Sequence, residues 1–471
     1  MSRLTQYSKR TWLDLDVASL PGPVTKLPPE ITSEIFKFVV LSSKKGRSSG
    51  VKALCLVDKC WNNIANATPD LWTKVTLAYP FHADQLSAAQ KRLKASEPKN
   101  IDVEIDLRDP TWDEPVGEIP LPSVNLLQAA IAALRGSEHR WRSIRIDFLD
   151  WDLTREFLGA WITPSFPALE SISFERSIMP YSAFSYQQNM ELRALLGDHR
   201  TLMPKLRKVA LYEMPLDWTS AAATSFQNLR KMVISGRPCE EGPNLGLFSE
   251  ALLVASPRLE ILEVGGYYYR VPGDPYTQAQ IPLVHLPALK RLVFGWSFAN
   301  LACPFLAILQ IPETLETLCL SQECKPFGDG HLIFDLLADL ASGGSGDKDP
   351  SKPWISTLGL KSLSMYGMCL DPQKVITFLQ NVPVIEEIHL KDIRQPVLEA
   401  TATLAGTRRL QSLKRLGVRW EWRSKDGSEG ACLVAERLRG SGWQVVVRKY
   451  FMGGGIELDA RFNEKDVERV S

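Results

Sequence analysis

The sequence contains no long uninterrupted apolar run and no excess of charge of either sign. Of its 471 residues, 55 are Lys or Arg and 54 are Asp or Glu, so the formal net charge is +1. A membrane-spanning helix needs about 20 predominantly apolar residues in a row, and the sequence has no such run. Proteins that bind nucleic acids or membrane surfaces usually carry a clear basic excess. We therefore expect neither a membrane nor a nucleic acid among the partners.

Secretory, disulfide and catalytic signatures are also missing. The N-terminal segment has no apolar stretch followed by a small-residue cleavage site, and the eight cysteines form no C-x-x-C pair. These features predict reduced thiols in the cytoplasm or the nucleus. The six histidines lie far apart, and no H-E-x-x-H, P-loop or G-x-G-x-x-G motif occurs. We expect no catalytic residue, no metal and no cofactor, and therefore no enzyme.

Near the N-terminus, a compact helical stretch is predicted over residues 25–77, after a polar, proline-punctuated segment over residues 1–24 that we interpret as a loose arm. Its first helix should begin at Leu27-Pro28-Pro29, because proline is tolerated in a first helical turn. The next apolar residues recur every four positions and share one helix face: Ile31, Ile35 and Val39.

A polar loop over residues 42–50 separates this helix from a second one, predicted from Val51 to Ala65. The apolar side chains of the second helix form a stripe at helical spacing: Leu54, Val57, Trp61 and Ile64. For both helices, packing in a small core and contact with a partner remain open alternatives.

The rest of the chain repeats one unit, L-x-x-L-x-L with apolar substitutions, at spacings mostly between 23 and 30 residues. The unit occurs at Trp141/Ile144/Ile146, Leu169/Ile172/Phe174, Leu206/Val209/Leu211, Leu229/Met232/Ile234, Leu259/Leu262/Val264, Leu289/Leu292/Phe294, Leu315/Leu318/Leu320, Leu360/Leu363/Met365, Ile385/Ile388/Leu390 and Leu413/Leu416/Val418. Trp72/Val75/Leu77 is a degenerate first copy. Helix-like stretches lie between several copies: VNLLQAAIAALRG, LFSEALLVAS, HLIFDLLADL, PQKVITFLQNV and CLVAERLRG.

Strand–helix alternation at this period is typical of a leucine-rich-repeat solenoid, in which neighbouring units bury the face that one unit cannot bury alone. The predicted fold class is therefore α/β, with a parallel sheet and outer helices over residues 78–471. A Gly/Ser/Asp-rich insert over residues 341–353 predicts a mobile loop. The segments WQVVVRKYF and IELDARF predict a terminal hairpin. The asparagine ladder of regular repeats is missing, which predicts irregular units.

The strings LPPEITSEIF, LCLVDKCWNNIA and TPDLW resemble the three blocks of the F-box, and the arrangement looks most like the F-box proteins with leucine-rich-repeat-like domains that are abundant in fungi. Asp58 departs from the pattern, because Cys or Ser is commoner at its position. The resemblance implies that the F-box binds a Skp-type adaptor, which joins a cullin scaffold, while the repeats select a protein target for ubiquitination. The adaptor-binding residues that it implies are Leu27, Pro28, Glu30, Ile31, Ile35, Phe36, Leu54, Val57, Lys59, Trp61, Leu71 and Trp72.

A target-binding surface is predicted on the sheet face opposite the leucines and on the loops that follow the strands. Tyr, Trp and Arg dominate interface hot spots, and such residues occupy these positions: Tyr267, Tyr268, Tyr269, Arg270, Trp296, Tyr366 and Trp420. Packing at the edges of irregular repeats is the alternative for these aromatics. For the chain as a whole, the alternatives are an interaction scaffold outside ubiquitin ligation and an unrecognised α/β enzyme.

Overall fold

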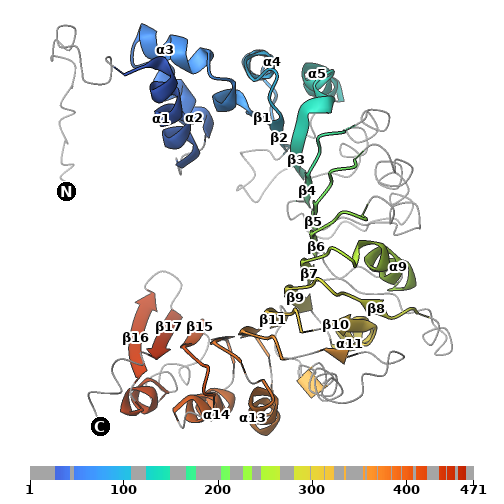
Figure 1. The fold of residues 1–471 in the computed structure, drawn as a ribbon, viewed down its shortest axis with the longest axis vertical. Coiled ribbons are helices and arrows are strands. Elements are labelled where there is room, and N and C mark those ends of the chain that lie inside the picture. The colour runs from blue at the N-terminus through green and yellow to red at the C-terminus, as the bar shows by residue number, and fades with distance from the viewer. Residues whose placement is uncertain are drawn as a thin grey trace, which may run out of the picture. The chain divides into compact units, whose positions relative to one another are not determined.

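The structure, a computed structural model, is mixed α/β (Figure 1). It separates into two compact units. One unit comprises Met1–Val75 and Gln90–Ile101, and the other comprises Thr76–Ala89 and Asp102–Ser471. The described residues are 27–42, 47–107, 124–148, 166–176, 203–212, 226–235, 245–265, 281–296, 299–311, 313–322, 334–335, 354–355, 358–368, 370–382, 384–393, 395–406, 410–421, 434–441, 443–450 and 455–462. The predicted arm over residues 1–24 and the predicted insert over residues 341–353 lie outside them.

The first unit is built on three helices and a short 3-10 turn. These are α1 (Pro29–Ser42), α2 (Arg47–Cys55), α3 (Lys59–Asn66) and η3 (Pro69–Trp72). Helix α1 begins at the predicted proline pair. The prediction of one helix from Val51 to Ala65 is wrong, because the chain turns between α2 and α3, where Asp58 caps α3 by accepting a hydrogen bond from the Trp61 N–H at 2.7 Å. The loop predicted over residues 42–50 is also too long, since α2 already begins at Arg47.

Three elements connect this module to the rest of the chain: β1 (Lys74–Ala78), α4 (Ala83–Ala95) and β2 (Ile101–Asp106). Both strands alternate half-buried and buried residues, the pattern of a strand with one face in a core. Strand β1 contains the degenerate first motif that includes Val75 and Leu77, and it is the first strand of the large sheet.

The large sheet has fourteen strands among the described residues, in the order β1-β2-β3-β4-β5-β6-β7-β9-β11-β13-β14-β15-β17-β16. The strands after β2 are β3 (Trp141–Phe148), β4 (Ser171–Arg176), β5 (Lys208–Tyr212), β6 (Lys231–Ser235), β7 (Ile261–Gly265), β9 (Arg291–Trp296), β11 (Thr317–Gln322), β13 (Ser362–Tyr366), β14 (Glu387–Lys391), β15 (Arg415–Glu421), β16 (Trp443–Tyr450) and β17 (Gly455–Phe462). Neighbours from β3 to β15 are parallel. The last two strands form the predicted antiparallel hairpin.

In each of the ten repeated motifs, the second and third apolar residues lie on one of these parallel strands, as predicted. The middle apolar residues of the motifs are direct register partners from strand to strand, and all are buried: Ile144, Ile172, Val209, Met232, Leu262, Leu292, Leu318, Leu363, Ile388 and Leu416. Because side chains alternate along a strand, a common register places every motif on the same face of the sheet. This shared column forms the core of the second unit.

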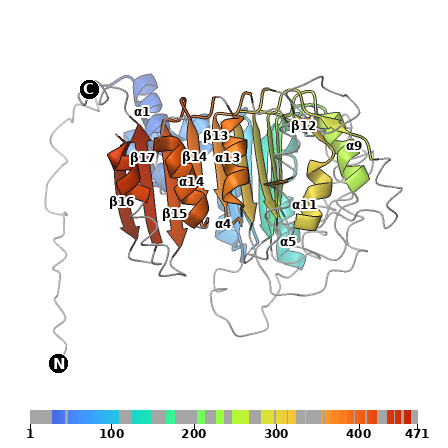
Figure 2. The same cartoon turned by 90° about the horizontal axis from the view of Figure 1, so that it is seen from below.

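Helices cover that apolar face. They are α5 (Val124–Leu134), α9 (Leu245–Ala255), α11 (Ala299–Leu306), α13 (Pro372–Gln380) and α14 (Gln395–Gly406), and in Figure 1 all lie on one side of the sheet, with its strands side by side in Figure 2. The Phe305 ring of α11 stacks on Phe294 of β9 at 5.3 Å and lies 5.6 Å from Phe248 of α9. All three rings are buried, so they join two helices to the sheet.

Three of the predicted helices are confirmed as α5, α9 and α13, and residues 434–440 of a fourth are helical. Of the helix predicted over residues 331–340, only Phe334 and Asp335 are described. Helices α11 and α14 were not predicted. A second, parallel sheet of two- and three-residue strands was also missed: β8 (Val284–His285), β10 (Leu309–Ile311) and β12 (Trp354–Ile355). Among the described helices, none is both long and apolar enough to cross a bilayer.

A row of charged residues marks the start of the parallel strands. We call it the strand-start row: Arg142, Glu170, Arg207, Arg230, Glu260, Lys290, Glu316, Lys361, Glu386 and Lys414. At every step the backbone N–H of one member donates to the carbonyl oxygen of the member before it, at 2.7–2.9 Å. Glu260 also forms ion pairs with Arg230 at 3.2 Å and Lys290 at 3.3 Å. The strand-start row links neighbouring strands through backbone hydrogen bonds and through side-chain ion pairs.

We expect Glu260→Lys to lower the free energy of unfolding by about 1 kcal/mol, since exposed ion pairs contribute a few tenths of a kcal/mol each and like charges repel by similar amounts. Urea denaturation should show the loss at low salt and a smaller loss at high salt, because salt screens exposed charges. Glu250→Lys, at an exposed position on α9, is the control. An equal loss in the control would mean that the strand-start pairs contribute nothing.

Candidate functional site

Helix α1 carries two apolar faces, and the core of its unit uses only one of them. Thr32, Phe36 and Val40 recur every four residues and are 1–2% exposed. One position earlier in each turn, Ile31, Ile35 and Val39 are 49%, 42% and 45% exposed. Positions four apart lie on one side of a helix. Helix α1 therefore presents a stripe of branched apolar side chains on its exposed side.

More exposed apolar residues lie close by in the sequence. Leu27 precedes α1, Phe38 lies within it, and Leu56 and Val57 form the turn between α2 and α3. Seven of the ten large apolar residues that are exposed among the described residues fall between Leu27 and Val57, and the others are Leu358, Val384 and Val446. Soluble proteins rarely concentrate exposed apolar side chains in this way unless the surface binds something. This module is therefore the strongest candidate site in the described part of the chain.

The surface rests on a well-packed interior. Its buried residues are Phe36, Val40, Val51, Leu54, Ala65 and Leu71, with Cys55, Trp61, Ile64 and Trp72 packed against them. The rings of Phe36 and Trp61 lie 4.9 Å apart and bring α1 against α3. The Trp72 indole Nε1–H donates to the carbonyl oxygen of Ala65 at 2.8 Å. These contacts hold the exposed stripe of α1 on a defined backbone.

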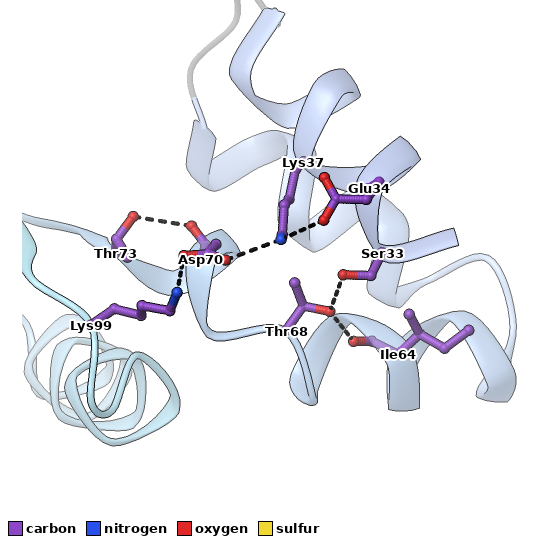
Figure 3. Close-up of polar contacts among 8 residues, drawn as sticks. All are labelled: Ser33, Glu34, Lys37, Ile64, Thr68, Asp70, Thr73 and Lys99. Atoms are coloured by element: carbon purple, nitrogen blue, oxygen red, sulfur yellow. Dashed lines mark hydrogen bonds and ion pairs between the residues drawn. The ribbon is translucent and has the colours of Figure 1, made fainter. Parts of the chain in front are cut away.

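Hydrogen bonds tie the end of α3 to α1 and to η3 (Figure 3). The Thr68 hydroxyl donates to the carbonyl oxygen of Ile64 at 2.7 Å and lies 3.0 Å from the Ser33 hydroxyl oxygen. Thr73 donates its hydroxyl proton to the carbonyl oxygen of Asp70 at 3.0 Å. The segment between α3 and β1 is therefore fixed at both of its ends.

Asp70 is the centre of an ion-pair group in the same unit (Figure 3). Its carboxylate lies 3.1 Å from Nζ of Lys37 on α1 and 3.3 Å from Nζ of Lys99, and Lys37 also pairs with Glu34 at 2.8 Å. Burial alone would raise the pKa of Asp70, but the hydrogen bonds from Lys37 and Lys99 outweigh burial, and the net pKa is lowered. The pKa of Lys37 is raised, first by its hydrogen bond to Glu34 and then by Asp70.

We expect Asp70→Asn to destabilise the helical module at neutral pH and to have no effect in strong acid. A carboxyl group whose pKa is lowered by folding stabilises the folded state above its unfolded pKa of about 4, and this stabilisation is lost as the pH falls through the folded pKa. Urea denaturation, with hydrogen exchange of peptides from residues 27–75, measures the difference at each pH. Glu97→Gln, at an exposed position of the same unit, is the control. A difference that persists at about pH 2 would contradict an ionic role.

The structure places all twelve predicted adaptor-binding residues in the N-terminal unit, at different depths. Seven are exposed: Leu27, Pro28, Glu30, Ile31, Ile35, Val57 and Lys59. Phe36, Leu54 and Leu71 are buried, while Trp61 and Trp72 are half-buried, so these five support the surface from within. The alternative of core packing thus applies to the buried members and does not apply to Ile31, Ile35 or Val57.

The chain matches no protein-family model and no curated protein. What the site does is therefore inferred from its own residues. Within the described ranges, no group of His, Cys, Asp and Glu side chains could hold a metal ion.

The predicted target-binding residues are only partly described. Tyr267, Tyr268, Tyr269 and Arg270 lie outside the described residues. Trp296 and Trp420 lie near the ends of β9 and β15, but only their backbone is described. Tyr366 ends β13 and is half-buried. Because side chains alternate along a strand and the buried Met365 faces the helices, Tyr366 lies on the opposite face of the sheet.

Register partners of Tyr366 extend across ten strands, and we call this set the terminal row: Asp147, Glu175, Tyr212, Ser235, Gly265, Gly295, Ser321, Tyr366, Lys391 and Arg419. Each member follows the last apolar residue of its motif. Among the predicted target-binding residues, only Tyr366 belongs to this row, although the residue after each motif is readable in the sequence. The order of residues along the terminal row becomes visible only when the strands are placed in register.

Proposed function

We propose that this protein is a non-catalytic substrate receptor of an SCF-type cullin ubiquitin ligase. In this proposal the module α1–α3 with η3 is an F-box that binds a Skp-type adaptor, and the adaptor connects the chain to a cullin. The strand–helix units then form an irregular leucine-rich-repeat-like solenoid that recruits a protein target. These partners would act in the cytoplasm or the nucleus.

The two-sided α1 helix carries the adaptor half of the proposal. A helix that only completed a three-helix core would need one apolar face, as Thr32, Phe36 and Val40 provide. The second face, with Ile31, Ile35 and Val39 exposed, is suited to an apolar partner surface. The resemblance of LPPEITSEIF, LCLVDKCWNNIA and TPDLW to the F-box blocks identifies the partner class. Asp58, the departure from that pattern, caps α3 and so supports the helix that carries Trp61.

The regular register of the sheet supports the repeat half. Parallel strands with the same apolar column and helices on one face are what stacked strand–helix units produce. Such an array leaves its opposite face for a target. A receptor of this kind needs no nucleophile, because holding the target near a charged conjugating enzyme raises the effective concentration of the reacting groups.

Affinity purification tests the proposal directly. The tagged full-length chain should co-purify with a Skp-type adaptor and, through it, a cullin. Recovery of the adaptor without any cullin would support the alternative of a scaffold outside ubiquitin ligation. Recovery of neither from cells that express both would contradict the proposal.

A further inference from the structure

The terminal row changes its chemistry in order from one end of the sheet to the other. It begins with the carboxylates Asp147 and Glu175, continues through Tyr212, and ends with Tyr366, Lys391 and Arg419. Between the two tyrosines stand only small residues: Ser235, Gly265, Gly295 and Ser321. Within the terminal row, the charges are thus separated by sign and the middle positions carry only small side chains.

Neighbouring positions on the same face carry charges of both signs, and in the middle strands Lys208, Lys231 and Arg291 stand against Glu263. At the first end, Glu104 and Asp106 of β2 add two carboxylates, and Arg145 is the cation that pairs with Asp147 at 2.9 Å and Glu175 at 2.7 Å. The carboxylates that act on the Arg145 guanidinium are Asp147, Glu175 and Glu104; the side chain of Asp147 is 4% exposed and that of Glu175 is 40% exposed.

At the other end, cations outnumber carboxylates at positions on the same face. The five cations there are Lys391, Arg415, Arg419, Arg448 and Arg461, against the four carboxylates Glu387, Glu421, Glu457 and Asp459. Asp459 pairs with Arg415 at 2.9 Å and with Arg461 at 3.1 Å. His389, also on this face, lies 3.4 Å from Glu387.

The two charged ends are too far apart to neutralise each other. Seven strand steps separate Glu175 from Lys391, which corresponds to about 34 Å at about 4.8 Å per step. The Debye length is about 8 Å at physiological ionic strength. A bound chain with opposite charges at its two ends would therefore be attracted electrostatically at both ends of the row.

The middle of the row provides room for a backbone. Gly265 and Gly295 are register partners, and no Cβ stands at either position. On four strands, the residue two positions before the row member lies on the same face and is buried: Ala210, Val233, Cys319 and Ser364. Tyr212 and Tyr366, both half-buried, flank this low segment. Tyrosines in such positions bury large areas and keep a polar hydroxyl, as interface hot spots do.

We propose that the terminal row binds an extended segment of a protein target that carries a basic stretch and an acidic stretch separated by about ten residues. The basic stretch lies over β2–β4, the neutral part crosses the low segment between Tyr212 and Tyr366, and the acidic stretch lies over β14–β16. This inference rests on the proposed receptor function, because it takes the partner of the sheet to be a protein target.

Fluorescent synthetic peptides and the full-length chain provide the test. The probe has a lysine block and a glutamate block joined by about ten neutral residues, and the control peptide has the same composition with lysine and glutamate alternating. Fluorescence anisotropy should show the block peptide binding about tenfold more tightly, with the difference shrinking at high salt. Equal affinities for the two peptides would overturn the inference.

Charge-reversal variants test whether the block peptide binds at the terminal row. Glu175→Lys and Lys391→Glu should each weaken binding of the block peptide several-fold, whereas Glu250→Lys on α9 should not change it. If neither reversal changes binding in chains with the wild-type melting temperature, or if Glu250→Lys weakens it equally, the inference is wrong. Adaptor co-purification is measured on the same preparations. A chain that binds the adaptor but does not distinguish the peptides refutes the terminal-row inference alone, whereas selective peptide binding without the adaptor refutes the receptor function alone.

Discussion

The double substitution Ile31→Glu/Ile35→Glu is expected to abolish co-purification of a Skp-type adaptor while the chain stays folded. Both side chains are more than 40% exposed on α1, so the carboxylates would remain in water in the free protein. In the complex they would be buried against an apolar partner surface, and an unpaired buried charge costs several kcal/mol. We expect the affinity to fall by about a hundredfold or more, measured by pull-down and titration with purified adaptor.

Val446→Glu is the matched control. Val446 lies on β16 and is 51% exposed, close to the 49% of Ile31, but it belongs to the other unit. The control should leave adaptor binding unchanged. If the α1 variant kept both its wild-type helicity and its adaptor affinity, the exposed stripe of α1 would not be the docking surface.

Phe305→Ala is expected to cause the largest loss of stability in the sheet unit. Phe305 is fully buried and contacts Phe294 of β9 and Phe248 of α9, so its removal leaves a cavity where two helices meet the sheet. Truncation of a buried phenylalanine costs about 3–5 kcal/mol through lost transfer energy and the residual cavity. Urea denaturation followed by circular dichroism measures the loss.

Phe38→Ala removes the same ring from an exposed position and serves as the control. Phe38 is 74% exposed on α1, and substitutions at exposed positions usually change stability by less than about 0.5 kcal/mol. If Phe305→Ala had an equally small effect, the three-ring cluster would not be the packing centre that its geometry indicates.

The positions of the parallel strands could be predicted from the sequence because one physical constraint repeats ten times. Every unit must place two apolar side chains on the same face, so the motif around Ile172 has the same spacing as those around Leu262 and Ile388. The terminal hairpin was equally readable, since two β-rich segments flank a glycine-rich turn. Helices α5, α9 and α13 have apolar residues at helical spacing and nearly the predicted bounds.

Other features depend on information that local patterns do not contain. Helix α11 is eight residues long and contains Pro304, which argues against a helix in the sequence, and its stability comes from the packing of Phe305. Strands β8 and β12 have only two residues each, too few for any alternation to appear. The break before α3 depends on Asp58, a helix-capping residue within what resembled one continuous stripe.

For the candidate site, the sequence identified the module but not which residues face outwards. The spacing of Ile31, Ile35 and Val39 was correct, yet the parallel series of Thr32, Phe36 and Val40 enters the core. Only three-dimensional packing determines which of two adjacent stripes is buried. Because the buried stripe includes a threonine, a hydrophobicity pattern does not reveal it. Thr32 compensates by donating its hydroxyl proton to the carbonyl oxygen of Pro28 at 3.2 Å.

The antiparallel hairpin of β16 and β17 also bears on how the chain avoids self-association. Strand β15 pairs with β17 along seven consecutive residues, from Arg415 to Glu421. Without the hairpin, that length of backbone would become a template on which another chain could add a strand, the usual route to aggregation between sheets. With it, the last strand of the sheet is β16, which carries Arg448 and Lys449, and charged residues on an outermost strand discourage such pairing. The hairpin thus protects the solubility of a long sheet as well as completing its core.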